Sequence, residues 1–470
     1  MSVVLGGGIG GLAAAYYLAK GGSKVALIEA TNRLGGWIRT IKDPETGVRF
    51  DKGPRTLRVR GDPAANTLSL IEELGLEERL YPITMDQPSA KNRMIYVKGA
   101  LHLLPSSVSS VFKIMPPFSK PLLLAMLKDL VAPAKKGKDD NIYDFVQRRF
   151  GFEVADYLVS AMICGICAGN AKDISVKFLM PQLFEWEQND RSVLVGFLKN
   201  IVKSKPGAKV AGGALIEKAL KDRWSIFGFK GGMEAFPEAL TDRIVTQGVD
   251  INLGKEVSRI SFQNGEVSCL VNGKMLNAEH IISSLPANKL SPLLKEEHPI
   301  LSSELAAIPF VDVAVVNLAY KGKRLSKEAF GFLIPPSQQV PILGVIFDSC
   351  NFDAGDWTVL TVMMGGAWFD KYFGSNVKDD QLLELAVSKT KEILHVEGSP
   401  AAYHVSVMRN CIPQYVVGHF DRIDRIKSYI KDKNLPLELV GSSYTGVGVN
   451  DVILSARRAA ETRLVRKAAA

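Results

Sequence analysis

The sequence predicts an α/β fold, and three observations point to it. Residues 2–29 read as a short apolar strand, a glycine turn, an alanine-rich helix and a second apolar strand. Apolar strand patterns return at 251–285 and at 439–443. Between them lie a mainly helical stretch, 83–203, and a stretch of alternating strands, 299–409. A chain of 470 residues, 47% of them hydrophobic, has apolar material for roughly two or three domains.

The first element carries a glycine pattern with a physical purpose. Gly6, Gly8 and Gly11 match G-x-G-x-x-G between the strand and the helix. Such glycines allow a tight turn, a close approach of backbone to a pyrophosphate, and close helix–strand packing. We therefore predict that a dinucleotide is bound by Gly6, Gly7, Gly8, Ile9, Gly10 and Gly11, with phosphates at the helix N-terminus. Glu29 ends the second strand, where a ribose-binding acid is expected in this Rossmann-like unit. The motif alone is equally compatible with NAD.

Two loops follow this unit. The first, Arg33-Leu34-Gly35-Gly36-Trp37, is expected to close over the same cofactor. The second, Gly53-Pro54-Arg55-Thr56, is a rigid turn with a cation at its tip. From the residues alone, Arg55 could equally be a solvated surface arginine.

A family resemblance rests on these motifs. The glycine motif, Glu29 and Arg33-Leu34-Gly35-Gly36 resemble the FAD-dependent amine-oxidase superfamily. Many members carry R-x-G-G-R, and Trp37 here replaces the second arginine, which points away from the amine oxidases proper. Further segments, collinear from about residue 2 to about 464, resemble the protoporphyrinogen oxidases of animal mitochondria; they are Asn92–Pro105, Cys167–Asn170, Lys230–Met233, Asn410–Tyr415 and Tyr444–Asp451.

The resemblance and the strand and helix patterns together divide the chain. Residues 1–84, 206–298 and 410–470 are expected to form a discontinuous FAD-binding domain. Residues 85–205 are expected to form a helical domain that is membrane-associated and contains a substrate channel. Residues 299–409 are expected to form a substrate-binding domain on an antiparallel sheet.

The resemblance implies an activity. It implies the oxygen-dependent oxidation of protoporphyrinogen IX to protoporphyrin IX, the penultimate step of heme biosynthesis. Six electrons leave in three hydride transfers to FAD, and three O2 become three H2O2. The residues themselves suggest no nucleophile or acid–base pair, because no G-x-S-x-G is present and the six histidines are dispersed. A flavin would therefore carry the chemistry.

Candidate site residues follow from this substrate, a large neutral ring with two propionates. Such a site needs apolar walls and a cation at one end. Arg93 is the preferred cation, although it could also be a surface arginine at a strand start. By resemblance, the walls are Phe330, Gly331, Leu333, Ile346 and Met363, with Met162 and Gly165 opposite, and Arg55 and Gly165 are predicted as catalytic residues. The further cofactor residues that it implies are Ala30, Arg33, Trp37, Gly53, Pro54, Arg55, Thr56, Val257 beside the adenine, and Val447, Gly448 and Val449 at a helix start.

Charge raises the question of a membrane. The net charge is +9 and the sequence pI is about 9.1, which fits nucleic acid, an anionic membrane or an anionic substrate. No nucleic-acid motif is present. A predicted helix over 119–132 is apolar on more than one side, so it needs either a core or a lipid surface, and Lys128, Lys135, Lys136 and Lys138 lie at its end.

The resemblance favours lipid. It implies a homodimer attached peripherally to the mitochondrial inner membrane on its intermembrane-space side. No apolar run is long enough to span a bilayer. The first strand starts at residue 2 or 3, so no cleavable presequence is expected.

The five cysteines show no disulfide framework. Cys164 and Cys167 form C-x-x-C without a second ligand pair, so we predict buried apolar residues and no metal. Two other functions stay open. An amine or polyamine oxidase would need an acidic or aromatic cage, against which Trp37 and Arg93 argue. A flavin-stabilised membrane scaffold would bind FAD without turnover.

Overall fold

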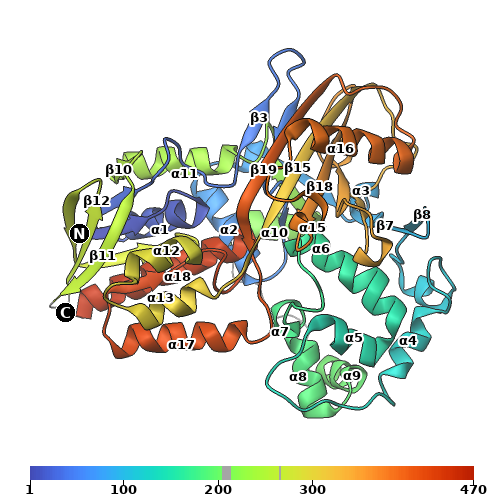
Figure 1. The fold of residues 1–470 in the computed structure, drawn as a ribbon, viewed down its shortest axis with the longest axis horizontal. Helices are drawn as coiled ribbons and strands as arrows, with labels where there is room; N and C mark the ends of the chain where they lie inside the picture. The colour runs from blue at the N-terminus through green and yellow to red at the C-terminus, as the bar shows by residue number, and fades with distance from the viewer. Residues whose placement is uncertain (204–212, 264–265, 470) are drawn as a thin grey trace.

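A computed structural model describes residues 1–203, 213–263 and 266–469 of the chain. Its centre is a five-stranded parallel sheet in the order β10 (Asp250–Asn252), β2 (Val25–Ile28), β1 (Ser2–Leu5), β14 (His280–Ser283) and β20 (Leu437–Leu439), which lies at the left of Figure 1. The three central strands β2, β1 and β14 are buried along their whole length because both faces of the sheet are covered. Val4 packs into one core, whereas Val3 and Leu5 pack into another. The α/β fold and the returning strands within 251–285 are confirmed. The strand expected at 439–443 was misplaced: it spans Leu437–Leu439, and the chain leaves the extended conformation at Gly441, whose φ is +109°.

Helices and small sheets cover the two faces. The side of Val4 carries α1 (Ile9–Lys20), α2 (Asp62–Glu73), α10 (Ala214–Lys221), α11 (Ala235–Thr246) and α18 (Val449–Ala469), with the sheet β5 (Leu57–Arg58), β9 (Trp224–Phe229) and β6 (Leu80–Thr84). The other side carries α12 (Ala287–Leu294), α13 (Pro299–Ala306), α17 (His419–Asp432) and the antiparallel sheet β11 (Val257–Gln263), β12 (Glu266–Val271) and β13 (Lys274–Ala278). Fully buried alanines of α1 let this helix lie close to its neighbours.

A second, seven-stranded sheet stands beside this unit (Figure 1). Its order is β19 (Ala402–Pro413), β15 (Phe310–Lys321), β18 (Trp357–Gly366), β17 (Gly344–Phe347), β16 (Gly331–Leu333), β7 (Met94–Val97) and β8 (Ala100–Leu103). All neighbours are antiparallel except β16 and β7, which run parallel. The helix α16 (Asp379–Leu394) covers one face. The hairpin β7–β8 comes from the stretch that we predicted to be mainly helical.

The helical region contains α4 (Leu122–Lys128), α5 (Ile142–Phe150), a π-helical turn at Val154–Ser160, α6 (Ala161–Cys167), α7 (Val176–Leu179), α8 (Pro181–Asp190) and α9 (Val193–Lys203). The predicted helix over 119–132 was too long. It starts after Pro121, and it ends where Asp129 turns to accept hydrogen bonds from Ser192 and Leu194 at the start of α9. The remaining short elements are β3 (Thr40–Lys42), β4 (Arg49–Asp51), α3 (Pro88–Lys91), α14 (Asp348–Asn351), α15 (Phe369–Phe373) and 3-10 turns at Glu77–Arg79, Val108–Phe112 and Pro336–Gln338.

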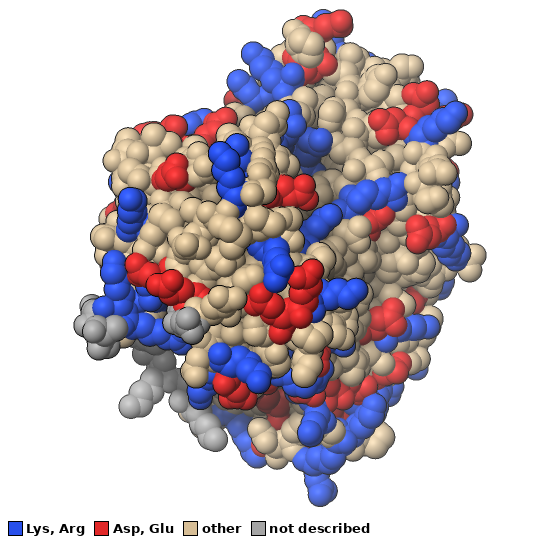
Figure 2. All heavy atoms as spheres, turned by 60° about the vertical axis from the view of Figure 1, so that its left-hand side comes forward, with Lys and Arg blue, Asp and Glu red and all other residues tan. Residues whose placement is uncertain are grey.

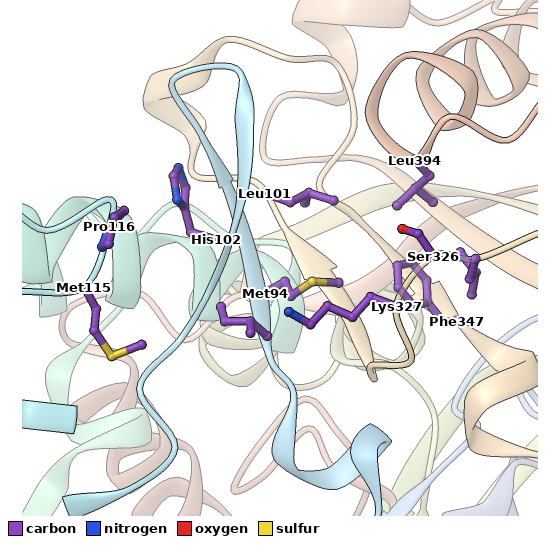
Figure 3. Close-up of a pocket in the computed structure, with 11 residues that line it drawn as sticks. Met94, Leu101, His102, Met115, Pro116, Ser326, Lys327, Phe347 and Leu394 are labelled. Carbon is purple, nitrogen blue, oxygen red and sulfur yellow. The ribbon is translucent and has the colours of Figure 1, made fainter. Parts of the chain in front are cut away.

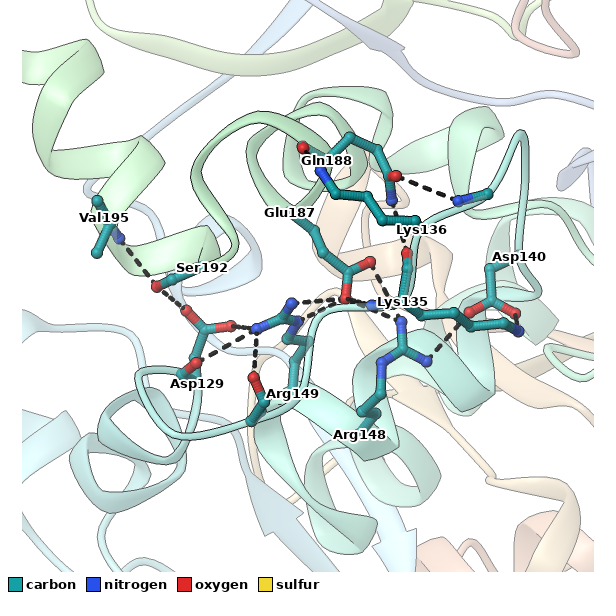
Figure 4. A network of polar contacts seen from close by, with 12 residues as sticks. Asp129, Lys135, Lys136, Asp140, Arg148, Arg149, Glu187, Gln188, Ser192 and Val195 are labelled. Carbon is teal, nitrogen blue, oxygen red and sulfur yellow. Dashed lines mark hydrogen bonds and ion pairs between the residues drawn. The ribbon is translucent and has the colours of Figure 1, made fainter.

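A buried charge network holds the helical region together (Figure 4). Arg149 is fully buried and donates through Nε and Nη2 to Glu187 at 2.9 and 2.6 Å, and through Nη1 to Asp129 at 3.2 Å. Arg148 joins Glu187 to Asp140. Since every one of these charges has an opposite partner, α5, α8 and the end of α4 are fixed to one another.

Two further expectations concern boundaries and surface. The predicted boundary at 205–206 lies outside the described residues, and the division into domains stays a prediction. In the described part of the chain, no helix combines the length and the apolar character that crossing a bilayer demands. On the face shown in Figure 2, Lys and Arg are interspersed with Asp and Glu, so the positive excess forms no continuous patch there.

Candidate functional site

The glycine loop is so tightly packed at Gly6 and Gly11 that a side chain does not fit there. Gly6 has φ +93°, a conformation that favours glycine, and Ser284 donates to its carbonyl oxygen at 3.0 Å. A Cβ on Gly11 would lie 1.8 Å from that same carbonyl oxygen. The loop is open at Gly8, where a Cβ would meet only the Cα of Gly36, at 3.9 Å. The loop is therefore tightly packed at Gly6 and Gly11, whereas space is left beside Gly8.

The second glycine loop docks on the first. The Gly35 N–H donates to the Gly7 carbonyl at 2.8 Å. Glu29 accepts from the Gly7 N–H at 2.6 Å and from the backbone and hydroxyl of Thr31, so this acid ties the end of β2 to the glycine loop. Arg33 donates to the Leu34 and Gly36 carbonyls and lies 3.8 Å from a Glu234 oxygen. Arg33 therefore supports its own loop.

Other predicted cofactor residues come from distant parts of the chain and meet this loop. The segment before Val257 pairs with the end of β2, because the Lys255 N–H donates to the Glu29 carbonyl at 2.9 Å. At the start of α18, Val452 lies within 3.0 Å of the Cβ position of Gly10. Val447 and Gly448 are half-buried at that turn, next to the buried Val449. Ala30 and Trp37 are exposed, and a Cβ on Gly53 would lie 2.3 Å from the Trp37 carbonyl.

Arg55 is an interior residue with 7% of its surface exposed, so it is not a solvated surface arginine. Its Nε lies 3.2 Å from Asp348, and its Nη2 donates to the Asp51 carbonyl at 2.8 Å. Thr361 donates a short hydrogen bond to the same Asp348 carboxylate. Burial raises the pKa of Asp348, and the Arg55 charge opposes that rise. Pro54 is exposed and Thr56 is half-buried in the same turn.

The predicted substrate walls share one face of the seven-stranded sheet. Register places Gly331 opposite Ile346, and Gly344 between Leu333 and Met363. Since side chains alternate along a strand, these positions face away from the core under α16. Leu333, Ile346 and Met363 are only half-buried, in strands whose other residues are mostly buried.

The helix α6 lies against this face. A Cβ on Gly165 would lie 2.8 Å from the Leu333 side chain, so glycine permits the approach. Gly165 itself is exposed and Met162 is half-buried. The structure thus brings the two sets of predicted wall residues together.

Arg93 lies at the end of this wall. It precedes β7, and the Phe330 N–H donates to the neighbouring Asn92 carbonyl at 3.1 Å. Its guanidinium carbon stands 4.2 Å from the centre of the Phe330 ring. Burial lowers the pKa of Arg93, and the nearby Arg58 charge lowers it further. None of the ion pairs found among the described residues involves Arg93.

Several site residues were missed by sequence reasoning. Asp348 directly follows β17, and Ser284 directly follows β14, so each is a polar residue at a strand end. A polar residue at a strand end was the signal that the sequence offered, but the partners of Asp348 and Ser284 are remote in sequence.

Cys164 and Cys167 are buried, and burial raises the thiol pKa of Cys167 to about 12. The described residues contain no cluster able to hold a metal ion.

Comparison with known proteins defines the class. The sequence model of the flavin containing amine oxidoreductases matches residues 9–462, and the chain belongs to this family. Within it, the chain is 41% identical to protoporphyrinogen oxidase of Bos taurus, over 97% of both chains, and 40% identical to that of Homo sapiens, with the same coverage. These matches place it among the protoporphyrinogen oxidases. The fold is also similar to a crystal structure from Exiguobacterium sp. 255-15, with a TM-score of 0.80 and 23% identity over 99% of this chain and 98% of that one.

Membership of this family makes the chain an FAD-dependent oxidoreductase. The geometry fits such a cofactor, because the open side of the loop at Gly8 is where a side chain would obstruct a pyrophosphate. The N-terminus of α1 has no side-chain cap, which leaves its first N–H groups for phosphate oxygens.

Proposed function

We propose that this chain oxidises protoporphyrinogen IX to protoporphyrin IX, with O2 as the electron acceptor, and thereby performs the penultimate step of heme biosynthesis. The observation that carries the proposal is a half-buried apolar sheet face that ends at Arg93, a half-buried arginine without an ion-pair partner among the described residues. A large ring with apolar faces and carboxylates at one edge matches that arrangement. The curated relatives at 40–41% identity carry the name of this activity.

The proposed roles divide between cofactor and chain. FAD, when bound, would accept the electrons from the substrate. The residues proposed to hold it are Gly6, Gly7, Gly8, Ile9, Gly10, Gly11, Glu29, Ala30, Arg33, Trp37, Gly53, Pro54, Arg55, Thr56, Val257, Val447, Gly448 and Val449. Arg55 would lie beside the flavin, held in the turn between these loops and the substrate wall by its ion pair with Asp348 and its hydrogen bond to the Asp51 carbonyl.

The chain would position the ring and cover both of its faces. Arg93 would bind one propionate with two parallel hydrogen bonds, while its aromatic neighbour Phe330 holds the guanidinium in place. Leu333, Ile346 and Met363 would cover one face of the ring, and Met162 on α6 the other. Gly165 keeps α6 close to the sheet, since any side chain there would meet Leu333. A pyrrole N–H proton can leave to water, so no side-chain base is required.

Turnover with a defined substrate tests this proposal. The FAD-loaded protein should convert protoporphyrinogen IX to fluorescent protoporphyrin IX and release about three H2O2 per porphyrin, the ratio fixed by six electrons and two per flavin cycle. Putrescine and cyclohexylamine should give no peroxide. Peroxide from an amine, with none from the porphyrinogen, would instead favour the amine-oxidase alternative.

We also propose peripheral attachment to a membrane. No residue of α4 is buried, and Leu124, Leu127 and Val131 on and beside it are 50%, 44% and 84% exposed. The adjoining α9 exposes Phe197 and Leu198, at 44% and 54%. Exposed apolar side chains of this kind fit the interfacial region of a bilayer. Three of the four lysines noted above are bonded within the protein, namely Lys128, Lys135 and Lys136, so apolar contact carries the proposal.

Vesicle sedimentation tests the attachment. Leu127→Glu combined with Phe197→Glu should release the protein from phosphatidylglycerol vesicles, whereas Val465→Glu, at a still more exposed apolar position on α18, should not. Equal release by both variants would contradict the proposal. As the resemblance implies, we propose that the membrane is the mitochondrial inner membrane on its intermembrane-space side, and that the enzyme acts there as a homodimer.

A further inference from the structure

A second cavity lies away from the site described above, at the outer edge of the seven-stranded sheet. It encloses about 430 Å³ beside β8, which is the last strand of that sheet. Eight of its eleven lining residues are apolar, and the lining is Met94, Leu101, His102, Leu103, Met115, Pro116, Leu325, Ser326, Lys327, Phe347 and Leu394. The size falls within the range of small-molecule pockets, roughly 300–1,000 Å³.

The floor of the cavity is apolar and fixed. Met94 and Leu103 are cross-strand partners, and both project to the side of the sheet that packs with Phe347 and Leu394. Phe347 is 1% exposed and Met94 is 6% exposed, so the cavity ends on the hydrophobic core. In Figure 3, Leu101 and Leu394 border the same space, while Met115 and Pro116 lie across the hairpin.

The rim of the cavity carries one cation, Lys327. The segment that holds it also includes Lys321, Lys323 and Arg324, all exposed, and the exposed Glu328 follows Lys327 directly. Within the described residues, none of these four cations forms an ion pair with a carboxylate. Figure 3 shows Lys327 extending from this loop alongside Met94, so its ammonium group stands over the apolar floor. A cation above an apolar floor complements a molecule with an anionic head and an apolar tail.

The approach to the cavity is apolar as well. Met115 lines it, and the preceding residues Phe112 and Ile114 are 59% and 63% exposed. Exposed apolar side chains therefore precede the lining residue Met115 in the chain, on either side of the exposed Lys113. A cavity near the lower end of the ligand range holds one chain more readily than two.

We propose that this cavity is a binding site for a long-chain fatty carboxylate, with the tail along β8 and the carboxylate at Lys327. The site is separate from the substrate wall, because Met94 and Leu103 project to the face opposite Leu333. The proposed binding of a fatty carboxylate therefore does not depend on the proposed oxidation of protoporphyrinogen IX. An acyl ligand there would contact the loop between β15 and β16 and the start of β7, two elements that flank Arg93.

Titration calorimetry of the FAD-loaded protein with dodecanoate, below its micellar concentration and with any detergent nonionic and constant, tests the proposal. We expect saturable binding of one dodecanoate, and weaker binding of hexanoate and of dodecyltrimethylammonium. Ser326→Trp, at an exposed rim position, should fill the mouth and abolish binding. Lys327→Met should weaken binding about three- to fivefold, as the loss of one exposed charge contact does. The matched Lys274→Met, an exposed lysine on β13, should change nothing.

Four results would overturn the proposal. Equal affinity for dodecanoate and dodecyltrimethylammonium would show that charge is not recognised. Binding that survives Ser326→Trp would place the ligand elsewhere, and an absence of saturable heat would remove the site. If a soluble short-chain phosphatidylglycerol displaced dodecanoate at a concentration below that of dodecanoate itself, the ligand of the cavity would be a phospholipid and not a fatty carboxylate.

Discussion

Gly8→Ala separates the needs of the cofactor from the needs of the fold. Gly8 has φ −71° and ψ 177°, which alanine adopts freely, and the nearest heavy atom to its Cβ position is 3.9 Å away. The FAD-free protein should therefore keep its stability or gain about 0.4–1 kcal/mol, because alanine restricts the unfolded chain. If a pyrophosphate occupies the open side of the loop, the added methyl group must crowd it. Crowding of this size costs on the order of 1–3 kcal/mol, or about five- to 150-fold in FAD affinity.

Two companion variants make the comparison sharp. A Cβ on Gly11 would lie 1.8 Å from the Gly6 carbonyl oxygen and 2.8 Å from the Ser284 hydroxyl. Gly11→Ala should therefore reduce both the unfolding free energy and FAD affinity. Gly137→Ala, with nothing closer than 3.7 Å and no part in the loop, should alter neither. FAD titration by fluorescence quenching and urea unfolding of the FAD-free proteins give the two quantities. Wild-type FAD affinity in Gly8→Ala would refute the placement of the pyrophosphate.

Three further predictions concern the substrate, the helical region and pH. Arg93→Ala should raise KM by about 10- to 150-fold, since a charged hydrogen bond contributes roughly 1.5–3 kcal/mol, and unchanged KM would remove Arg93 from the site. Arg149→Met should lower the free energy of unfolding in urea by about 3–5 kcal/mol, because Asp129 and Glu187 stay buried without the cation that pairs with them. A loss no larger than that caused by Arg458→Met, at an exposed position, would contradict the role of the network. Burial lowers the pKa of His419 to about 4 from an unfolded value of about 6.5, so the unfolded state binds the proton first and stability should fall as pH drops below about 6.5. His419→Phe keeps the stack on Tyr415 and should flatten that fall, and an unaltered slope would count against it.

Local sequence patterns predicted those elements that are specified by residues close together in the chain. The glycine loop, the parallel strands β1, β2, β10 and β14 and the register-defining strands β15, β17 and β18 are confirmed because glycine spacing and apolar alternation act over a few residues. The strand predicted at 439–443 was misplaced and lies at Leu437–Leu439. The helix over 119–132 was wrong in length because Asp129 finds its partners more than sixty residues later, at Ser192 and Leu194. A long-range hydrogen bond of this kind leaves no trace in periodicity.

The candidate site shows the same division. The cofactor loop was predicted from spacing, whereas the pairing of Arg55 with Asp348 could not be, since the partners are almost three hundred residues apart. The hairpin β7–β8 was hidden in a helical stretch because its sheet neighbour, β16, is supplied from residues 331–333. The wall residues came from the family resemblance, and only the register explains why they share a face.

Anaerobic reduction of the bound flavin tests the central claim most directly. Protoporphyrinogen IX, added to the FAD-loaded protein without O2, should bleach the flavin absorption band, and admitting O2 should restore it with release of H2O2. Arg93→Ala should need a higher porphyrinogen concentration for the same bleaching. Flavin that stays oxidised at saturating protoporphyrinogen IX would contradict the proposed function.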